Sequence, residues 1–320
     1  MIMRKLLPLI IILLALFFIG RGWWNSQLAA VSNDTSTQVI VVSKGETFGK
    51  LASKLKQKGL IKSPWAFTLL AKQTGLGSKI QTGSFKVSPS MSAKEVLETL
   101  TSQPSDYWVT LLEGWRIEEM AQELSSKFQV PSSKFIKLAK EGYMFPDTYL
   151  FARDVTEEQI VQRLENTFNQ KYTENLRAKI RASGLTENQG VILASVVERE
   201  ARSDQVRQMV ASIMLKRYKI GMALNADATI QYALGYQQKE KSWWKRHLTK
   251  EDLKVNSPFN TYLYAGLPPG PIANPSLSSL TAVANANPST PYLYYYHDSK
   301  GNSYYAETLE EHNANVANHP

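Results

Sequence analysis

The chain has 320 residues, of which 43% are hydrophobic, and it carries a formal net charge of +9. A chain of this length and apolar content can bury a sizeable core, which excludes a disordered protein. The absence of cysteine excludes disulfides, a thiol nucleophile, cysteine-ligated zinc and a lipid-modified N-terminal cysteine. The positive charge is typical of proteins that work beside polyanions, meaning anionic lipids, acidic wall polymers or nucleic acid.

The first 24 residues predict a transmembrane anchor. Basic residues precede an uncharged apolar run over residues 6–19, and Arg21 follows it with two tryptophans. The run is short and also suits a signal peptide, but no small-residue cleavage pattern follows it, and arginine beside tryptophan is typical of a membrane interface. We therefore expect a single-pass protein of the cell (inner or cytoplasmic) membrane, with its N-terminus in the cytoplasm and the rest outside. This location predicts no nucleic-acid partner.

Residues 25–37 are polar and small, which predicts a linker, and residues 38–105 predict a small module of strands and helices. Its expected elements are strands at 38–42 and 83–87 and helices at 48–55, 64–73 and from 93 onward. Ser92 and Glu95 form a capping box that opens the last of these helices.

The stretch from Val41 to Ala52 contains the pattern V-x-x-G-E-T-x-x-x-L-A. This pattern resembles the core of the LysM fold, a small peptidoglycan-binding domain. The resemblance implies an α/β module that binds glycan. The additional helix and a second half reaching about Ser102 exceed a minimal LysM unit, so a module that serves only for packing is the alternative.

Residues 106–320 predict a larger α+β domain. It should open with a strand at 107–112, continue through helices up to residue 183, and include a buried strand at 292–296. Residues 141–151 combine turn formers with aromatic side chains, which suits either a sugar-binding loop facing a cleft or part of the core.

An apolar helix that carries two carboxylates is the most informative stretch. Thr186 and Gln189 form a capping box, so the helix should begin at about Glu187 and continue to about Arg202. Its otherwise apolar sequence ends with Glu198 and Glu200. Burying an ionised carboxylate costs several kcal/mol or more unless it is paired or protonated, so these glutamates require a partner or a function.

The two glutamates point to different sides of the helix. At roughly 100° per residue, Glu198 lies beside small residues that leave a hollow, whereas Glu200 lies on the far side. Spacing therefore favours a functional role for Glu198 and a structural one for Glu200. The alternative is that Glu198 only pairs with Arg202 one helical turn later, a contribution of about half a kcal/mol on an exposed helix.

Six ordered motifs resemble the endolytic murein transglycosylases, the YceG-like family. They are E-G-Y-x-F-P-D-T-Y at 141–149, A-S-V-V-E-R-E at 194–200, L-x-x-D-x-T-x-x-Y at 224–232, S-P-F-N-T-Y at 257–262, G-L-P-P-G-P-I-A-N-P at 266–275 and E-H-N at 311–313. The third residue of the fourth motif, Phe259, replaces the family's tyrosine. The resemblance implies that residues 106–320 form a YceG-like catalytic domain.

The activity implied by the resemblance is lytic cleavage of the β-1,4 bond between MurNAc and GlcNAc in peptidoglycan strands, which leaves 1,6-anhydroMurNAc ends and terminates or trims nascent strands. One carboxyl group can protonate the leaving oxygen and then accept the proton of the attacking 6-hydroxyl. We predict Glu198 for both steps. We expect no cofactor and no metal, and peptidoglycan synthases are possible protein partners.

The residues expected to bind substrate come from the other motifs: Tyr143, Asn225, Asp227, Thr229, Asn260, Tyr262 and Asn274. Asp227 can equally serve as a helix N-cap or assist catalysis. The proline-rich run at 267–275 suits a groove wall or a brace. His312, which lacks metal-site spacing to the other histidines, is interpreted as structural.

Two other functions stay open at this point. A non-catalytic peptidoglycan-binding scaffold would keep the module and the groove. A water-using muramidase would need a second carboxylate, for which Asp227 and Glu141 are the candidates. The basic and tryptophan-containing run at 239–246 can stack on glycan, touch the membrane or fold inward, and we favour a surface insertion.

Overall fold

The computed structural model describes residues 2–43, 45–128 and 130–319, with only the backbone described for residues 2–12. The chain divides into two compact units. The first comprises Met1–Trp108 and Leu150–Arg153, and the second comprises Val109–Tyr149 and Asp154–Pro320. The predicted boundary between residues 105 and 106 lies close to the first crossing. The return of 150–153 to the first unit was not predicted.

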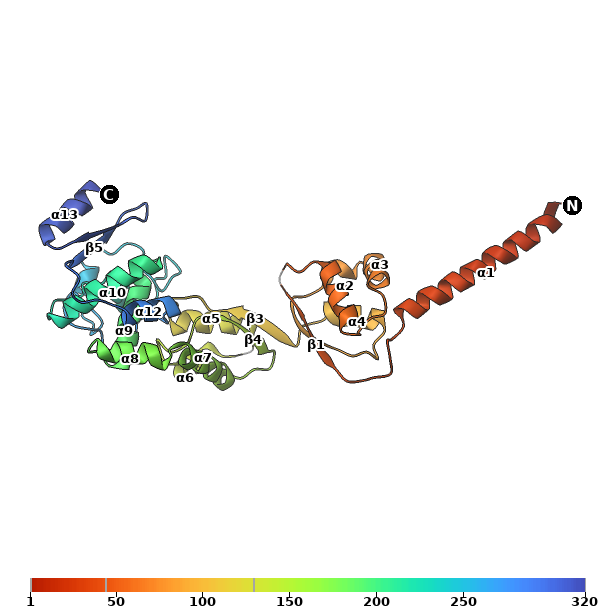
Figure 1. Cartoon of the computed structure of the whole chain (residues 1–320), viewed down its shortest axis with the longest axis horizontal. Coiled ribbons are helices and arrows are strands. Elements are labelled where there is room, and N and C mark those ends of the chain that lie inside the picture. The colour runs from red at the N-terminus through yellow and green to blue at the C-terminus, as the bar shows by residue number, and fades with distance from the viewer. Residues whose placement is uncertain (1, 44, 129, 320) are drawn as a thin grey trace. The chain divides into compact units, whose positions relative to one another are not determined.

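The first unit contains strand pairs covered by short helices (Figure 1). Its elements are α1 (Ile2–Leu28), β1 (Gln38–Val42), α2 (Phe48–Gln57), α3 (Pro64–Thr74), the 3-10 helix η1 (Leu76–Lys79), β2 (Gly83–Val87) and α4 (Ala93–Thr101). Strands β1 and β2 pair antiparallel, with Ile40 opposite Phe85. Both side chains are buried, as is Phe67 of α3. The strands and helices predicted between residues 38 and 102 are confirmed, including the capping box at Ser92.

The N-terminal helix extends further than the sequence predicts. Helix α1 ends at Leu28, so the predicted linker begins inside a helix. Within the portion of the chain that was described, no helix is long and apolar enough to cross a membrane. Part of the predicted span, residues 6–12, lies outside the described side chains. The rings of Trp23 and Trp24 lie 6.4 Å and 6.0 Å from the ring of Trp65 in α3.

The rest of the predicted linker is hydrogen-bonded to the module. The backbone nitrogen of Val31 donates to the carbonyl of Pro89 at 3.0 Å, and the carbonyl of Asp34 accepts from the Ser90 nitrogen at 3.0 Å and the Ser88 hydroxyl at 2.8 Å. These bonds hold the segment along the loop after β2. Residues 31–34 of the predicted linker are therefore tied to the module by hydrogen bonds.

The second unit is mostly helical, and the chain enters it through β3 and leaves it briefly through β4. The remaining elements are β3 (Asp106–Thr110), α5 (Ile117–Lys127), α6 (Ser132–Leu138), β4 (Thr148–Ala152), α7 (Glu157–Lys171), α8 (Glu174–Ala182), α9 (Glu187–Glu200), α10 (Asp204–Lys219), α11 (Asp227–Leu234), the 3-10 helix η2 (Asp252–Lys254), α12 (Leu277–Ala284), β5 (Tyr294–His297), β6 (Ser303–Ala306) and α13 (Leu309–Asn318). The sheets have the orders β1-β2-β3-β4 and β5-β6. The predicted α+β class is confirmed.

Helix α9 forms the centre of the second unit. It contacts α8, α10, α11 and α12; Figure 1 shows α8, α10 and α12 around it. Residues 190–197 are all buried. A helix that is apolar on every side is expected in such an enclosed position. Gly190 allows close packing, because a Cβ there would lie 2.7 Å from the Ile180 side chain of α8. The carboxylates at the end of α9 are thus held on a rigid element.

The aromatic stretch at 141–151 belongs to the core. Met144, Phe145 and Tyr149 are each at most 5% exposed, and the Tyr149 hydroxyl donates to the Phe145 carbonyl at 2.7 Å. Its last residues form β4 rather than a loop. Of the two interpretations left open by the sequence, packing is the one that the structure supports.

Candidate active site

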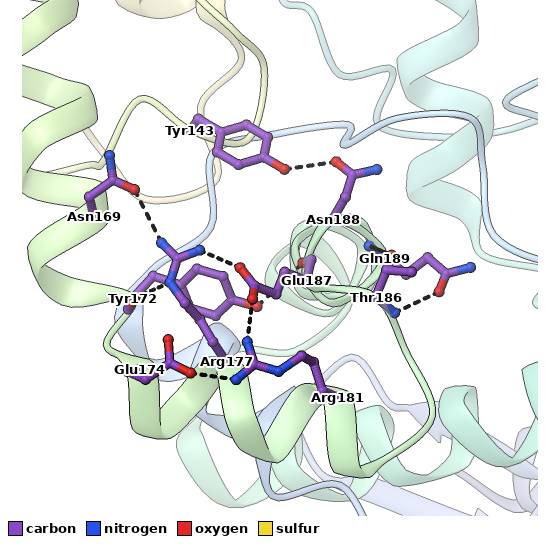
Figure 2. A network of polar contacts seen from close by, with 10 residues as sticks. All are labelled: Tyr143, Asn169, Tyr172, Glu174, Arg177, Arg181, Thr186, Glu187, Asn188 and Gln189. Atoms are coloured by element: carbon purple, nitrogen blue, oxygen red, sulfur yellow. Dashed lines mark hydrogen bonds and ion pairs between the residues drawn. The ribbon is translucent and has the colours of Figure 1, made fainter.

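Charged and polar contacts fix the beginning of α9 (Figure 2). Thr186 and Gln189 form the predicted capping box. The Glu187 carboxylate accepts hydrogen bonds from the guanidinium groups of Arg177 and Arg181, both on α8. The hydroxyl of Tyr143 donates to the side-chain oxygen of Asn188 at 2.7 Å. These partners satisfy the helix start and place negative charge where the helix dipole favours it.

The Glu198 side chain lies in a closed, fully bonded environment. Its carboxylate accepts from Arg207 at 2.9 Å, and from the backbone nitrogen and hydroxyl of Ser276 at 2.9 Å and 2.5 Å. Only 4% of the side chain is exposed. Arg207 and Ser276 occupy the space beside Glu198 where the small neighbouring residues predicted a hollow. The alternative partner Arg202 is not the one observed.

Glu200 lies beside an open pocket. One carboxylate oxygen accepts from the Ala228 backbone nitrogen at 3.3 Å, and the other accepts from the Tyr295 hydroxyl at 3.1 Å. Burial raises the pKa of Glu200 to about 7; the Ala228 nitrogen opposes this shift and the negative charge of Asp227 adds to it. Glu200 is therefore a carboxyl group that exchanges a proton near neutral pH.

The pocket has a volume of about 480 Å³ and is lined by both polar and aromatic side chains. The lining residues are Glu200, Arg217, Asn225, Asp227, Tyr262, Tyr294, Tyr295, Tyr296, His297, Leu309 and His312. A second hollow of about 440 Å³ shares Glu200 and His297 with it. Glu200 thus lies where two hollows meet, a position that suits a group acting on an extended chain.

Asp227 is held by one tyrosine at the pocket surface. The hydroxyl of Tyr262 donates to an Asp227 carboxylate oxygen at 2.6 Å. Burial, and to a smaller extent the hydrogen bond to Asp227, raises the pKa of Tyr262, so the phenol stays protonated. Asp227 is the first residue of α11, and the N-cap is Ala226. Of the two roles that the sequence left open for Asp227, the N-cap is wrong, because the side chain points to Tyr262.

The structure brings three of the seven predicted substrate-binding residues together in the pocket: Asn225, Asp227 and Tyr262. Asn225 adopts a positive φ of 50°, which aspartate and asparagine tolerate better than most residues. Tyr143 does not line this pocket; its hydroxyl is bonded to Asn188, and its role in substrate binding stays a prediction.

The other three, Thr229, Asn260 and Asn274, are wholly buried. The Thr229 hydroxyl bonds to the Ala226 carbonyl at 2.6 Å, and the Asn260 amide donates to two carbonyls at 3.0 Å and 2.8 Å. The prediction that they line the groove is wrong. Their polar groups are used inside the protein, where buried amides and hydroxyls are expected to be bonded.

Asn274 connects three segments of the second unit. Its side chain accepts from the Met144 nitrogen at 2.9 Å and donates to the Trp115 carbonyl at 3.0 Å and the Glu141 carboxyl at 2.9 Å. The proline-rich run to which it belongs also bonds to α9, since the Ile272 nitrogen donates to Ser195 at 3.0 Å. The run is thus a brace, one of the two roles expected for it.

Sequence reasoning missed several residues of the pocket. Glu200 was assigned a structural role, and Arg217, Tyr295 and His297 were not considered for the site. The signal for Tyr295 was present, because a polar group on a predicted strand of tyrosines can face a cleft. Nothing local in the sequence marked Arg217. Across the chain segments that the structure covers, no group of three or more histidine, aspartate or glutamate side chains could hold a metal ion.

The run at 239–246 is only partly a surface insertion. Trp244 is 8% exposed, and the Arg199 guanidinium lies 3.8 Å from its ring centre. Its indole nitrogen donates to Glu119 at 2.9 Å. This tryptophan folds inward against α9, because the guanidinium and the carboxylate offer it partners there. Its neighbour Trp243 stays partly exposed.

A helical unit with a central buried helix and a carboxyl group titrating near neutral pH in a tyrosine-lined pocket defines an enzyme-like site. The sequence matches the YceG-like family over residues 40–318, and the chain belongs to that family. It is 31% identical to an endolytic murein transglycosylase of Bacillus subtilis, over 90% of this chain and 87% of that protein.

Two further comparisons agree. The chain is 26% identical to an endolytic murein transglycosylase of Streptococcus pneumoniae, over 92% of this chain and 60% of that protein. The fold is similar to the crystal structure of a yceG-like protein from Listeria monocytogenes, with a TM-score of 0.61, 24% identity, and coverage of 87% of this chain and 98% of that chain.

Proposed function

We propose that the protein is an endolytic lytic transglycosylase that cleaves the MurNAc-GlcNAc bond of peptidoglycan strands and leaves 1,6-anhydroMurNAc ends. Membership of the YceG-like family and the names of the relatives support the reaction class. The observation that carries the site is the position of Glu200, which lies in a pocket with Asp227 and Tyr262 and has a pKa of about 7.

Glu200 is better placed than Glu198 to act as the acid and base. A general acid must hold a proton at the operating pH and reach the leaving oxygen. Glu200 meets the first condition through burial and the second through its place in the pocket. Glu198 is enclosed by Arg207 and Ser276, whose hydrogen bonds occupy both of its carboxylate oxygens. The catalytic role predicted for Glu198 stays a prediction, and the hydrogen bonds around its carboxylate do not favour that role.

The proton moves twice in the proposed reaction. Protonated Glu200 donates to the GlcNAc oxygen as the glycosidic bond breaks. The resulting carboxylate is stabilised by the Ala228 nitrogen and the Tyr295 hydroxyl. It then accepts the proton of the MurNAc 6-hydroxyl as that oxygen attacks the anomeric carbon, so Glu200 ends protonated as it began. The negative charge of Asp227 favours this protonated state and is placed to stabilise positive charge developing on the sugar.

A water-using muramidase is the second candidate, because Asp227 supplies another carboxylate in the same pocket. Glu141, the other carboxylate considered for that role, is buried against Asn274 and does not line the pocket. The two reactions differ in their products. A hydrolase leaves reducing MurNAc ends, and a lytic transglycosylase leaves anhydro ends.

Digestion of purified glycan strands, followed by mass spectrometry of the products, tests the proposal. We expect the wild type to produce anhydro ends and Glu200→Gln to produce none. Glu198→Gln should also produce anhydro ends, at a rate lowered only in proportion to the fraction of the protein that is folded. Reducing ends would establish the muramidase. Full activity of Glu200→Gln together with loss in folded Glu198→Gln would return the catalytic role to Glu198. No cleavage by any form would indicate a scaffold.

The membrane anchor is part of the same proposal. Basic residues, the apolar run at 6–19 and the tryptophans after it support a single-pass segment with an external catalytic unit and a cytoplasmic N-terminus. In cells, the full chain should resist extraction by alkaline carbonate, whereas a chain lacking residues 2–24 should be extracted. Release of the full chain by carbonate would refute the anchor. Contacts with peptidoglycan synthases would follow from this location.

The LysM-like role of the first unit also remains a proposal. Its strand-helix-helix-strand order and a hollow of about 370 Å³ lined by Phe48, Thr68 and Lys72, among others, support glycan binding. Phe48 stacks on the buried Phe67, with ring centres 5.4 Å apart, so its position is fixed. Pull-down of the Phe48→Ala protein with insoluble peptidoglycan tests this, and unchanged binding would favour a module that serves only for packing.

A further inference from the structure

An aromatic pair stands on the second unit apart from the Glu200 pocket. The rings of Tyr236 and Trp243 meet edge to face with centres 5.2 Å apart, and Tyr236 is 39% exposed. Two hollows of about 360 Å³ and 310 Å³ meet at this pair and share Gln122. None of these residues lines the Glu200 pocket. The function proposed above does not use this surface.

A buried cation holds the indole of Trp243 in place. The guanidinium of Arg116, which is 5% exposed, lies 4.7 Å from the Trp243 ring centre and 4.1 Å from that of Tyr232. Arg116 is itself fixed by two 3.1 Å hydrogen bonds to the Glu118 carboxylate and one of 3.2 Å to the Tyr232 carbonyl. The indole is therefore oriented before any ligand arrives, which lowers the entropy lost on binding.

The hairpin that carries the pair is also well anchored. The Gln237 nitrogen donates to the Ser242 carbonyl at 2.7 Å, and the Gln237 side chain donates to the Gly235 carbonyl at 2.9 Å. Trp244 secures the other end through Glu119 and Arg199. A rigid aromatic surface that stays partly exposed suggests a ligand.

We propose that Tyr236 and Trp243 form a second glycan-binding site, which holds a GlcNAc residue of a strand outside the Glu200 pocket. This inference rests on the proposed function, because a glycan-cleaving protein meets this ligand. The rings cover the apolar face of a pyranose, as aromatic side chains do for sugars. Glu118, Glu119 and Glu123 line the hollows; each already accepts from a protein donor, Arg116, Trp244 and Lys127 respectively. Their remaining lone pairs accept from sugar hydroxyls and the acetamido N–H.

The polar groups of the lining suit an uncharged sugar. Three carboxylates line the hollows, but Glu118 is paired with Arg116 and Glu123 with Lys127, and Lys241 also lines them, so the surface carries little net charge. Such a surface does not attract the carboxylates of a MurNAc peptide stem and accepts an uncharged sugar with hydroxyl donors. The GlcNAc residues of the strand are of this kind. Binding a strand both here and at Glu200 would favour long strands over short fragments.

Fluorine NMR of the full chain labelled with 5-fluorotryptophan tests the site directly. The Trp243 signal is identified as the one missing from Trp243→Phe among the seven tryptophans. We expect this signal to shift on titration with chitohexaose, and Tyr236→Ala to weaken that titration about tenfold, the equivalent of 1.4 kcal/mol. Tyr264→Ala, a control at a tyrosine that is 50% exposed and lines neither hollow, should leave it unchanged.

Two outcomes would overturn the proposal: a Trp243 signal that stays unmoved while other tryptophan signals shift, or equal titrations for Tyr236→Ala and wild type. Steady-state kinetics give an independent readout. Tyr236→Ala should raise KM for long strands with kcat unchanged, and should not alter cleavage of short fragments. Because chitohexaose binding needs no cleavage, a protein that binds but cuts nothing would refute the proposed function and leave this site standing.

Discussion

Arg207 donates a 2.9 Å hydrogen bond to Glu198, and the two side chains, 10% and 4% exposed, form a buried ion pair between α10 and α9. Removing one partner of a buried ion pair destabilises the fold, because the charge of the other partner then loses its compensation. Glu200, two residues further along α9, lines the pocket instead. The two glutamates of one short motif thus have different consequences when they are changed.

Glu198→Gln should destabilise the second unit, by less than the about 3–5 kcal/mol of a wholly uncompensated buried charge, because Arg207 then keeps only the exposed Asp204 as an ionic partner. Denaturant unfolding followed by circular dichroism measures this. The double variant Glu198→Leu with Arg207→Met should recover much of the loss, since neither charge then remains buried. A Glu198→Gln protein with wild-type stability would show that the pair contributes nothing.

The pH dependence of cleavage should follow Glu200. With a pKa of about 7, the acid form declines above neutral pH, so kcat/KM should fall about tenfold per pH unit there. Asp227→Asn removes a negative charge that raises this pKa, so the decline should begin at lower pH. Tyr262→Phe keeps that charge and should not shift the decline downward. A decline at the same pH in Asp227→Asn would contradict the assignment.

Glu141 should make the fold less stable at alkaline pH. Burial raises the pKa of Glu141 to about 8, well above its value in the unfolded chain. The folded state therefore binds the proton more tightly, and this contribution is complete at acid pH and is lost as pH rises to about 8, by up to about 1.4 kcal/mol per unit. Denaturant titrations at pH 5 to 9 should show a weaker decline for Glu141→Gln than for wild type. The exposed Glu251→Gln should behave as wild type.

Gly142 should tolerate no side chain. Its φ is +86°, and a Cβ there would lie 2.5 Å from Pro271 and 3.1 Å from Val191. Gly142→Ala therefore combines backbone strain of about 1–3 kcal/mol with overpacking of similar size. Gly266, with φ +103° and open space around it, provides the matched control. Thermal unfolding should show a larger loss of stability for Gly142→Ala than for Gly266→Ala. Equal losses would mean that the proline-rich run shifts to make room for the new side chain.

Local patterns in the sequence predicted most of the secondary structure. The capping boxes at Ser92 and Thr186 marked helix starts that the structure reproduces. Apolar periodicity located the core helices, and a short run of β-branched residues located β1. These features depend on near neighbours along the chain, which explains why they could be read directly. The path of residues 25–37 could not be read in this way, because its hydrogen-bond partners lie in the loop after β2.

Burial of polar residues was the main source of error within the site. Asn260 and Asn274 belong to motifs rich in polar side chains, which suggested a groove. In the fold, the Asn274 amide instead joins Trp115, Met144 and Glu141, segments about 130 or more residues away along the chain. Partners so far away along the chain cannot be identified from the sequence. Without them, an asparagine that is bonded inside the protein cannot be told from one that binds a ligand.

By itself, the sequence determined the chain's family through six ordered motifs, and the helical period placed Glu198 and Glu200 on different faces of α9. Only the tertiary structure showed which of the two carboxylates lines a pocket. Arg207 and Ser276 close over one carboxylate, and Tyr295 and the start of α11 hold the other beside open space. Those groups lie 9, 78, 95 and 28 residues away, so the surroundings of each glutamate are a property of the packed fold rather than of its motif.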